Sequence, residues 1–278
     1  MLPHFVVIGA MKSGTTSLHE YLRTHPMVFM PAVKETHFFD ATQGNWHRGL
    51  AWYESQFRGA SPGDVVGEAS PGYTRHPAVP GVAGRLASVL PAARLIYLVR
   101  HPIDRMRSQY QQNALYEGER QPIDEALLGN PHYADCSRYA MQLDQYLEHF
   151  PPEQILVITS EALRTRRRDA LVQVFEFIGV HAEWMPPNLD QEAHQSIETR
   201  SRGAVGRLVR RVPGHGRLAD AVPEKVLTLW RRAATRPVAP DAFAISDDTR
   251  RRLEEQLAPD VARLRRFLGN DFDGWGIG

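Results

Sequence analysis

Short apolar runs recur along the chain, separated by longer segments in which apolar residues follow helical spacing. Four runs are continuous enough to predict strands buried on both faces of a parallel sheet. These runs are Phe5–Ile8, Val65–Gly67, Arg94–Arg100 and Ile155–Thr159. The run at Arg94–Arg100 is the clearest, because a continuous apolar core lies between two arginines.

Helical spacing fills most of the intervals between these runs. The expected helices are about Gly14–Arg23, Trp46–Phe57, Pro80–Leu90, one starting at Pro102, Tyr139–Leu147 with Ser137 as N-cap, Leu171–Ile178 and Asp248–Leu268. From Trp184 onwards strand patterns disappear, and a short helix is expected at Ala204–Arg211. The last helix carries a single apolar face formed by Leu253, Leu257, Val261, Leu264 and Leu268.

This alternation predicts an α/β fold, with a central parallel sheet flanked by helices and a largely helical C-terminal part. No internal repeat, low-complexity tract or linker interrupts the chain. We therefore expect residues 1–278 to form a single domain, with a subregion of helices and loops at about 184–278.

Composition and charge exclude some classes of protein. Hydrophobic residues make up 42% and charged residues 23% of the chain, as in an ordinary globular protein. The net charge of +1 hides a block of six arginines without an acid between Thr199 and Ala219. Such a block indicates a solvated face or an anion-binding loop, and not a nucleic-acid-binding protein.

The single cysteine, Cys136, excludes an internal disulfide framework and a metal site built from several cysteines. We expect it to be a buried or half-buried thiol. The N-terminus lacks a signal-peptide pattern, and no stretch approaches about 18 uninterrupted apolar residues. The expectation is a cytoplasmic protein without a transmembrane segment.

The first strand leads directly into the loop AMKSG and the helix start TTS. Unpaired backbone N–H groups, the hydroxyls of Thr15, Thr16 and Ser17, and the ammonium of Lys12 meet at one helix N-terminus. This combination predicts a site for a phosphate or sulfate. The alternative is a turn that only caps the helix, with Lys12 in solvent.

The position of Lys12 separates this loop from the nucleoside-triphosphate loop G-x-x-x-x-G-K-[ST]. That motif needs a lysine directly after its second glycine, followed by the hydroxyl that binds Mg²⁺. Lys12 instead precedes Gly14 by two residues. The loop therefore does not match that of ATP- or GTP-binding proteins.

A second polar cluster lies in PAVKETHFFD, Pro31–Asp40. Glu35 and His37 are the best-placed general bases if this segment folds back over the first strand. Lys34 and Phe38 are candidate substrate contacts. The alternative assigns the charged residues to the surface and the phenylalanine to the core.

Two strand ends carry further candidates. Ser70 and Tyr73 follow the strand at Val65–Gly67 and can line a pocket, or else form a Pro-Gly turn. Arg100 ends the clearest strand, and Ser108 lies eight residues further on in the following helix. A guanidinium and a hydroxyl so separated can meet through a group bound by both, and a phosphate suits that role.

A run of arginines, Arg164 and Arg166–Arg168, opens the helix that contains Leu171. Basic residues are unfavourable at a helix N-terminus unless their charge is offset. We interpret them as a solvated first turn.

Four motifs in one order resemble the sulfotransferases that use 3′-phosphoadenosine 5′-phosphosulfate (PAPS). They are KSGTTSL at Lys12–Leu18, KETHFFD at Lys34–Asp40, EASPGY at Glu68–Tyr73 and RHPIDRMRSQY at Arg100–Tyr110. The K-E-x-H-F-F segment looks most like the heparan sulfate sulfotransferase-like and bacterial sulfotransferase branch. The resemblance implies a P-loop-like fold and a single sulfotransferase domain.

The resemblance also implies roles for individual residues. Lys12 would contact the bridging and 5′-phosphosulfate oxygens, and Arg100 and Ser108 would hold the 3′-phosphate. Glu35 matches the acidic general base of the heparan branch, while His37 is a second candidate because other sulfotransferases use histidine. The remaining cradle residues would be Ser13, Gly14, Thr15, Thr16 and Ser17. Arg200 and Arg202 would belong to a lid over the nucleotide, or else are solvated.

The implied reaction is in-line sulfuryl transfer from PAPS to a hydroxyl, less often an amine, of a carbohydrate, glycolipid or natural product. The other product would be adenosine 3′,5′-bisphosphate, and no metal is needed. Ala69 stands where the heparan enzymes often carry a lysine, which disfavours a polyanionic glycan. The expected partner is a small-molecule or glycan acceptor, without nucleic acid, and the protein is expected to be a monomer or homodimer.

Two other functions remain open at this stage. A P-loop-type phosphotransferase would need a lysine after the second loop glycine and a strand-end aspartate for Mg²⁺. The clearest strand ends in Arg100 instead. A non-catalytic nucleotide-binding module would keep the loop and need no base.

Overall fold

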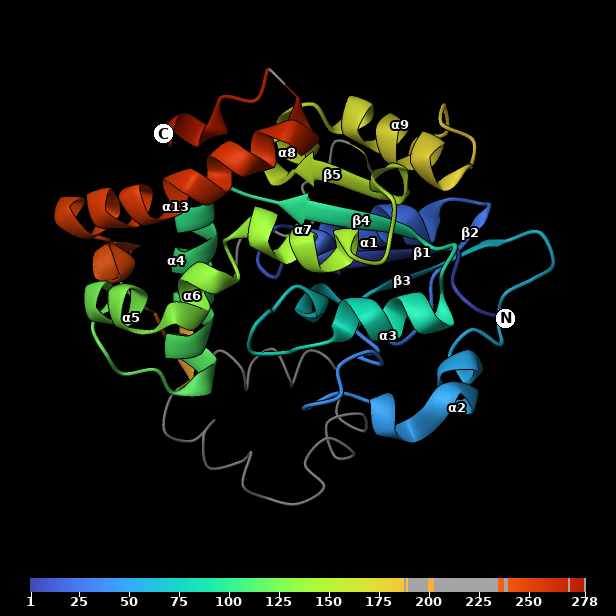
Figure 1. Cartoon of the computed structure of the whole chain (residues 1–278), viewed down its shortest axis with the longest axis horizontal. Coiled ribbons are helices and arrows are strands. Elements are labelled where there is room, and N and C mark those ends of the chain that lie inside the picture. The colour runs from blue at the N-terminus through green and yellow to red at the C-terminus, as the bar shows by residue number, and fades with distance from the viewer. Residues whose placement is uncertain (188, 190–199, 203–234, 238–239, 270, 278) are drawn as a thin grey trace.

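A five-stranded parallel sheet forms the centre of the computed structural model, in the order β2-β3-β1-β4-β5 (Figure 1). The structure describes residues 1–187, 189, 200–202, 235–237, 240–269 and 271–277. The strands are β1 (Phe5–Gly9), β2 (Val28–Phe29), β3 (Val65–Ala69), β4 (Arg94–Val99) and β5 (Ile155–Thr159). The α/β fold and all four expected strands are confirmed, whereas the edge strand β2 is too short to leave a pattern in the sequence.

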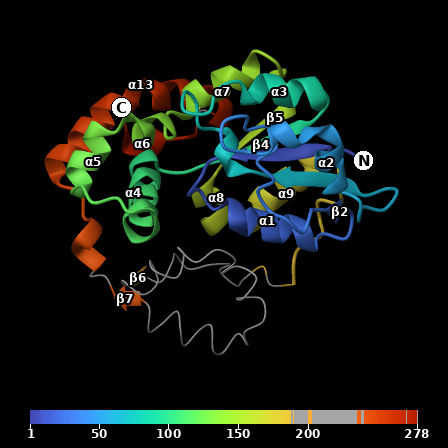
Figure 2. The ribbon, with the colours of Figure 1, turned by 90° about the horizontal axis from the view of Figure 1, so that it is seen from below.

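Helices cover both faces of this sheet (Figure 2). Helices α1, α8 and α9 lie on one face, and α3 and α7 lie on the other. Their bounds are α1 (Thr15–Thr24), α3 (Val82–Val89), α7 (Tyr139–Leu147), α8 (Ser160–Thr165) and α9 (Arg167–Ile178). Along β1, Phe5 and Val7 face the first layer while Val6 and Ile8 face the second. Burial on both faces explains why the strand is apolar at every position.

A third apolar cluster lies beyond the carboxyl end of β4, between α4 and the helices that follow it. The elements are α4 (Pro102–Gln112), a π-helical turn η3 (Asn113–Glu117), α5 (Ile123–Gly129), α6 (Pro131–Asp135) and α13 (Asp247–Leu268). Helix α13 buries Leu253, Leu257, Val261 and Leu264, as its periodicity predicts, whereas Leu268 is only partly buried. Phe272 and Trp275 then pack back against the main core.

Two expectations about local structure are wrong. Arg138, and not Ser137, is the N-cap of α7. The buried Ser137 hydroxyl instead accepts a bond from Arg105 Nε at 2.5 Å and donates to the Pro102 carbonyl at 3.1 Å. The expected helix Trp46–Phe57 is a 3₁₀ turn, η1 (Trp46–Arg48), followed by a shorter α2 (Gly49–Ser55), because Gly49 has a positive φ of 75°.

The part beyond Trp184 also contains strand structure that its sequence pattern does not show. Strands β6 (Arg200–Arg202) and β7 (Thr235–Pro237) pair antiparallel. Strands of three residues are too short for a two-residue periodicity to be read. The helix expected at Ala204–Arg211 lies outside the described residues.

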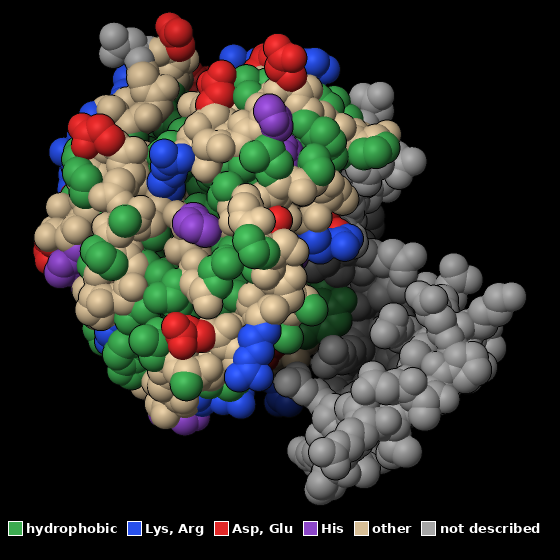
Figure 3. Space-filling model, turned by 90° about the vertical axis from the view of Figure 1, so that its right-hand side faces the viewer, with side chains coloured by type: hydrophobic (Ala, Val, Ile, Leu, Met, Phe, Trp, Pro, Cys, Tyr) green, Lys and Arg blue, Asp and Glu red, His purple; other side chains and the backbone are tan. Residues whose placement is uncertain are grey.

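On the face shown in Figure 3, acidic and basic side chains are interspersed with apolar ones, and neither charge dominates. Within the described residues, no helix combines the length and apolar character needed to cross a membrane. Cys136 is buried and has no disulfide partner, as expected.

Candidate active site

A cavity of about 660 Å³ opens at the carboxyl ends of the parallel strands. Crevices at this edge are the usual binding sites of open α/β sheets. Its walls come from the segments that follow β1, β2, β4 and β5, and from α4. The charged residues among the described lining are the basic Lys12, Lys34, Arg100, Arg164 and Arg167 and the acidic Glu35 and Glu161. Five cations against two carboxylates suit an anion with several charges.

The loop between β1 and α1 brings the helix N-terminus to this cavity. Gly9, the last residue of β1, is required just before this loop, because a Cβ there would come within 2.1 Å of Thr74 Oγ1. Lys12 and Gly14 have positive φ angles of 70° and 90°. No side chain caps α1 at Gly14, and its first turn contains no acid. The positive end of the helix dipole therefore faces the cavity with no acid in its own first turn to neutralise it.

Most residues predicted for the cradle line the cavity. Gly14, Thr15, Thr16 and Ser17 do so together with Lys12. Ser13 does not, since it is fully buried beneath the loop. Its hydroxyl is therefore not exposed to the cavity.

Lys12 reaches across the cavity to α4, where Nζ donates to Gln112 Oε1 at 2.9 Å. Burial lowers the pKa of this lysine, and the neighbouring charges of Arg100 and Arg105 lower it further. Its ammonium is thus held where positive charge is costly. An anion in the cavity would relieve that cost.

Arg100 and Ser108, predicted to share a bound group, line the same cavity. The arginine is fixed at both ends, since Nη1 donates to the Lys12 carbonyl at 3.3 Å and its own carbonyl accepts from Tyr139 Oη at 2.7 Å. The fold therefore brings together the strand-end guanidinium, the helix hydroxyl and the β1–α1 loop.

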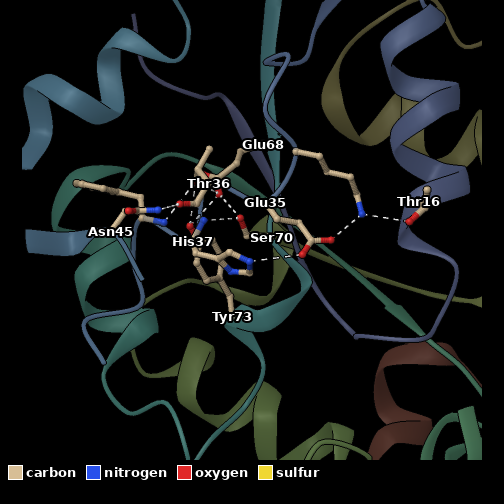
Figure 4. A network of polar contacts seen from close by, with 10 residues as sticks. Thr16, Glu35, Thr36, His37, Asn45, Glu68, Ser70 and Tyr73 are labelled. Atoms are coloured by element: carbon tan, nitrogen blue, oxygen red, sulfur yellow. Dashed lines mark hydrogen bonds and ion pairs between the residues drawn. The ribbon is translucent and has the colours of Figure 1, made fainter. Parts of the chain in front are cut away.

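Glu35 is held from two sides by neighbouring side chains (Figure 4). Lys34 Nζ lies 2.8 Å from Oε1, and His37 Nε2 lies 3.4 Å from Oε2. The hydrogen bond from His37, followed by that from Lys34, lowers the pKa of Glu35 to about 2 against the opposing effect of burial. Glu35 lines the cavity and His37 does not. This geometry favours Glu35 as the base and His37 as the residue that orients it.

A buried carboxylate, Glu68 at the end of β3, organises the segment that carries Glu35 (Figure 4). Its Oε1 accepts from Thr36 Oγ1 at 2.7 Å, Ser70 Oγ at 2.6 Å and Tyr73 Oη at 2.8 Å. Its Oε2 accepts a short bond from Tyr53 Oη. Burial, with Glu68 alongside, raises the pKa values of both tyrosines, so the phenols remain protonated donors.

These bonds fix the backbone around the candidate base. Glu35 and His37 both have positive φ angles, 64° and 48°, which are uncommon outside glycine and cost free energy. Backbone N–H groups of these residues donate to the Ala69 carbonyl at 3.1 Å and to Ser70 Oγ at 3.1 Å. Thr36 lies between them and is held by Glu68. The strained segment is therefore held in place by the end of β3.

Replacing Glu68 with alanine is expected to lower the free energy of unfolding by about 3–4 kcal/mol. Four buried hydroxyl donors would lose their acceptor, and this loss outweighs the gain from no longer burying a charge. Glu68→Gln should cost less, because an amide oxygen remains. Urea titrations of both variants test this, with Glu176→Ala on the exposed side of α9 as a control. A Glu68→Ala protein as stable as the wild type would contradict the anchoring role.

Phe38, Ser70 and Tyr73, proposed from sequence as substrate contacts, lie beneath the cavity wall and not on it. The Phe38 ring stacks on Tyr53 at 4.2 Å between centroids and is 1% exposed. The hydroxyls of Ser70 and Tyr73 donate hydrogen bonds to Glu68. Substrate contact by these three side chains has no support in this geometry, because packing and the carboxylate already use them.

Sequence reasoning missed several residues of the lining. Gln112 carries no motif, and its role follows only from contact with Lys12. The arginines interpreted as a solvated helix start include two that line the cavity, Arg164 and Arg167. Arg167 also lies over Tyr21, at 5.9 Å from the ring centroid. The unexplained cluster of positive charge at a helix start was the available signal.

Two further expectations concern the lid over the nucleotide and a metal site. The backbone of Arg200 and Arg202 lies in β6, while their side chains are outside the described structure. A lid role for them stays a prediction. In the described part of the chain, no group of three or more His, Cys, Asp or Glu side chains is arranged to hold a metal ion.

Comparison with known proteins places these features in context. The sequence model of the family described as "Sulfotransferase domain" matches residues 2–203. The human bifunctional heparan sulfate N-deacetylase/N-sulfotransferase 3 is 32% identical over 200 residues, covering 64% of this chain and 22% of that protein. The mouse heparan sulfate glucosamine 3-O-sulfotransferase 3B1 is 32% identical over 189 residues, covering 64% and 46%. The chain thus matches less than half the length of either relative.

A solved structure extends the similarity over the full chain. The crystal structure of a sulfotransferase from Alicyclobacillus acidocaldarius superposes with a TM-score of 0.71 at 25% identity. The match covers 99% of each chain. Helix α13, which lies beyond residue 203, is therefore within the matched length.

Proposed function

The chain belongs to the sulfotransferase domain family, and from this premise we propose that it transfers a sulfuryl group from PAPS to an acceptor hydroxyl, less often an amine. The observation that carries this proposal is the meeting of Lys12, the uncapped start of α1 and the Glu35 carboxylate in one basic cavity. The lining suits a donor with two anionic ends: the α1 start for its 5′ end, and Arg100 with Ser108 for a 3′-phosphate.

We assign one part of the transfer reaction to each of three groups. Glu35 takes the proton of the acceptor as the new sulfur–oxygen or sulfur–nitrogen bond forms. Lys12 stabilises the charge that develops on the leaving phosphate as the bond from sulfur to the bridging oxygen breaks. The amides at the start of α1 orient the oxygens of the donor, so most of the rate enhancement comes from positioning and electrostatics, as in phosphoryl transfer.

The acceptor is proposed to be a carbohydrate, glycolipid or natural product. The heparan sulfate named for the relatives supports a sugar. Ala69 provides no cation on the β3 end for a polyanionic chain. One relative is named as a bifunctional N-deacetylase/N-sulfotransferase and another as a 3-O-sulfotransferase. The proposal therefore includes both nitrogen and oxygen as acceptor atoms.

The direct test is transfer of ³⁵S from labelled PAPS to a panel of neutral sugars, glycolipids, phenols and heparan fragments. Appearance of labelled acceptor with release of adenosine 3′,5′-bisphosphate supports the function. Tight binding of ATP-Mg²⁺ without binding of the bisphosphate would favour a phosphotransferase. Bisphosphate binding without turnover on any acceptor would favour a non-catalytic module.

Arg100→Met is expected to weaken binding of adenosine 3′,5′-bisphosphate by about tenfold or more, because a charge-assisted contact with the 3′-phosphate is lost. Binding of adenosine 5′-monophosphate, which lacks that phosphate, should change little. Calorimetry with both nucleotides measures the difference. The control is Arg107→Met. Arg107 lies on α4, pairs with Asp104 and does not line the cavity. Equal weakening of both nucleotides would reject the assignment.

We further propose that residues 1–278 form one sulfotransferase domain. Helix α13 contributes Leu264 to the main core and Leu253 and Leu257 to the cluster around α4. Its Asp260 also accepts bonds from the backbone N–H groups of Ala140 and Met141 at the start of α7. Removal of α13 is expected to expose both clusters.

A further inference from the structure

Lys34 makes a pair of contacts that its motif does not explain. Its Nζ lies 2.8 Å from Glu35 Oε1 and 3.1 Å from Thr16 Oγ1. Glu35 is the candidate base, and Thr16 belongs to the first turn of α1, where the 5′ end of the donor is proposed to bind. A single ammonium therefore bridges the acceptor side and the donor side of the cavity.

The surroundings leave this ammonium able to move. The side chain of Lys34 is 23% exposed and that of Glu35 is 40% exposed, so neither is fixed by deep burial. Lys34 lines the cavity and, like Lys12, is held there by a side-chain oxygen of the protein. An entering anion at the start of α1 would lie beside Thr16 and compete with Glu35 for the same donor groups.

We propose that Lys34 couples donor binding to the base: its ammonium leaves Glu35 for the 5′-terminal anion of the bound donor, and the carboxylate is then free to accept the proton. This inference rests on the proposed function. The sequence assigned Lys34 to the candidate substrate contacts, and the present proposal assigns it to the donor instead. The exchange forms and breaks no covalent bond.

The electrostatics of Glu35 agree with such an exchange. A carboxylate whose pKa is lowered to about 2 is a weak base at neutral pH. The charged or titratable groups facing it are Lys34 and His37 on its own segment, Lys12 on the loop after β1 and His19 on α1. Removing the Lys34 contact raises the pKa of Glu35 part of the way to its ordinary value, since the bond from His37 remains. A stronger base is thus produced only when the donor is present.

Binding experiments test the donor contact without requiring turnover. Lys34→Met is expected to weaken adenosine 3′,5′-bisphosphate about tenfold and to leave adenosine 3′-monophosphate, which lacks the 5′ group, unchanged. Lys34→Arg should retain much of the affinity. Arg23→Met removes a positive charge from the outer side of α1, where Arg23 pairs with Glu20, and serves as the control. Unchanged bisphosphate binding by Lys34→Met overturns the proposal.

The pH dependence of transfer tests the coupling itself. In the wild type, the acid limb for kcat/KM of the acceptor at saturating PAPS should lie at higher pH than the limb for kcat/KM of PAPS, because donor binding frees Glu35. In Lys34→Met the two limbs should coincide. Coincident limbs in the wild type overturn the coupling. If no variant or wild-type protein transfers sulfate, the proposed function fails, whereas the nucleotide comparison still decides whether Lys34 contacts the 5′ group.

Discussion

Glu35→Gln is expected to lower kcat for sulfuryl transfer by about 10²- to 10⁴-fold, the usual contribution of a positioned general base. The amide preserves the size of the side chain and one oxygen for Lys34 or His37 but cannot take the acceptor proton. Affinity for adenosine 3′,5′-bisphosphate should be kept or increase, because Lys34 loses its competing carboxylate. Steady-state rates with labelled PAPS, together with calorimetry, measure both effects.

A matched control and a second variant make this result decisive. Glu20→Gln changes a carboxylate on α1 that does not line the cavity, and should leave kcat unchanged. His37→Gln should reduce kcat less, by about tenfold, and should shift the acid limb to higher pH, because His37 is the main cause of the low pKa of Glu35. Full activity in Glu35→Gln combined with loss in His37→Gln would make His37 the base.

The sign of the pH dependence follows from the same carboxylate. The pKa of Glu35 is lowered, so the ionised form required of a base is present throughout the neutral range. Acid inactivation through this group in the donor-free protein is expected only as the pH falls toward about 2, the lowered pKa. An acid limb near neutrality for kcat/KM of PAPS would contradict a Glu35 base in this environment.

Lys12→Met is expected to lower kcat by about 10²- to 10³-fold, comparable to removing one preorganised donor from an oxyanion site. The ammonium is the group aimed across the cavity from the β1–α1 loop, and burial, followed by the charges of Arg100 and Arg105, lowers its pKa. Methionine keeps the length of the side chain and loses the charge. Single-turnover rates at saturating PAPS measure the change separately from nucleotide affinity.

Arg58→Met, at an exposed position next to α2, is the control for a general loss of positive charge. Thermal unfolding of Lys12→Met should match the wild type, because among the described residues its side chain bonds to the partly exposed Gln112. Wild-type turnover in a folded Lys12→Met protein would refute a catalytic role for the lysine. It would also leave the alternative in which the loop only caps α1.

Local sequence patterns determined much of the architecture. Continuous apolar runs predict β1, β3, β4 and β5 because strands covered on both faces need no polar alternation. The displaced lysine before Gly14 separates this loop from nucleoside-triphosphate loops, and the order of four motifs gives the family. The cradle residues Thr15, Thr16 and Ser17 were identifiable because an anion site at a helix start uses adjacent residues.

Only the tertiary structure decided which residues far apart in the chain contact one another. The sequence assigned Ser70 and Tyr73 to substrate, yet they donate to Glu68, whose burial could not be inferred from a short strand end. It treated the arginines at the start of α9 as solvated, although Arg167 lines the cavity. Chain distance carries no information about such contacts, since the carboxyl ends of parallel strands meet regardless of their separation along the chain.

By itself, therefore, the sequence determined the α/β class, the family and the position of the loop proposed to bind the anion, because each depends on consecutive or regularly spaced residues. The tertiary structure alone decided that Glu35 faces the cavity and His37 stands behind it, that Glu68 fixes both, and that Lys34 lies between base and cradle. These facts depend on left-handed backbone angles at Glu35 and His37 and on hydrogen bonds across strand ends. Such geometry arises only when segments far apart in the chain pack together.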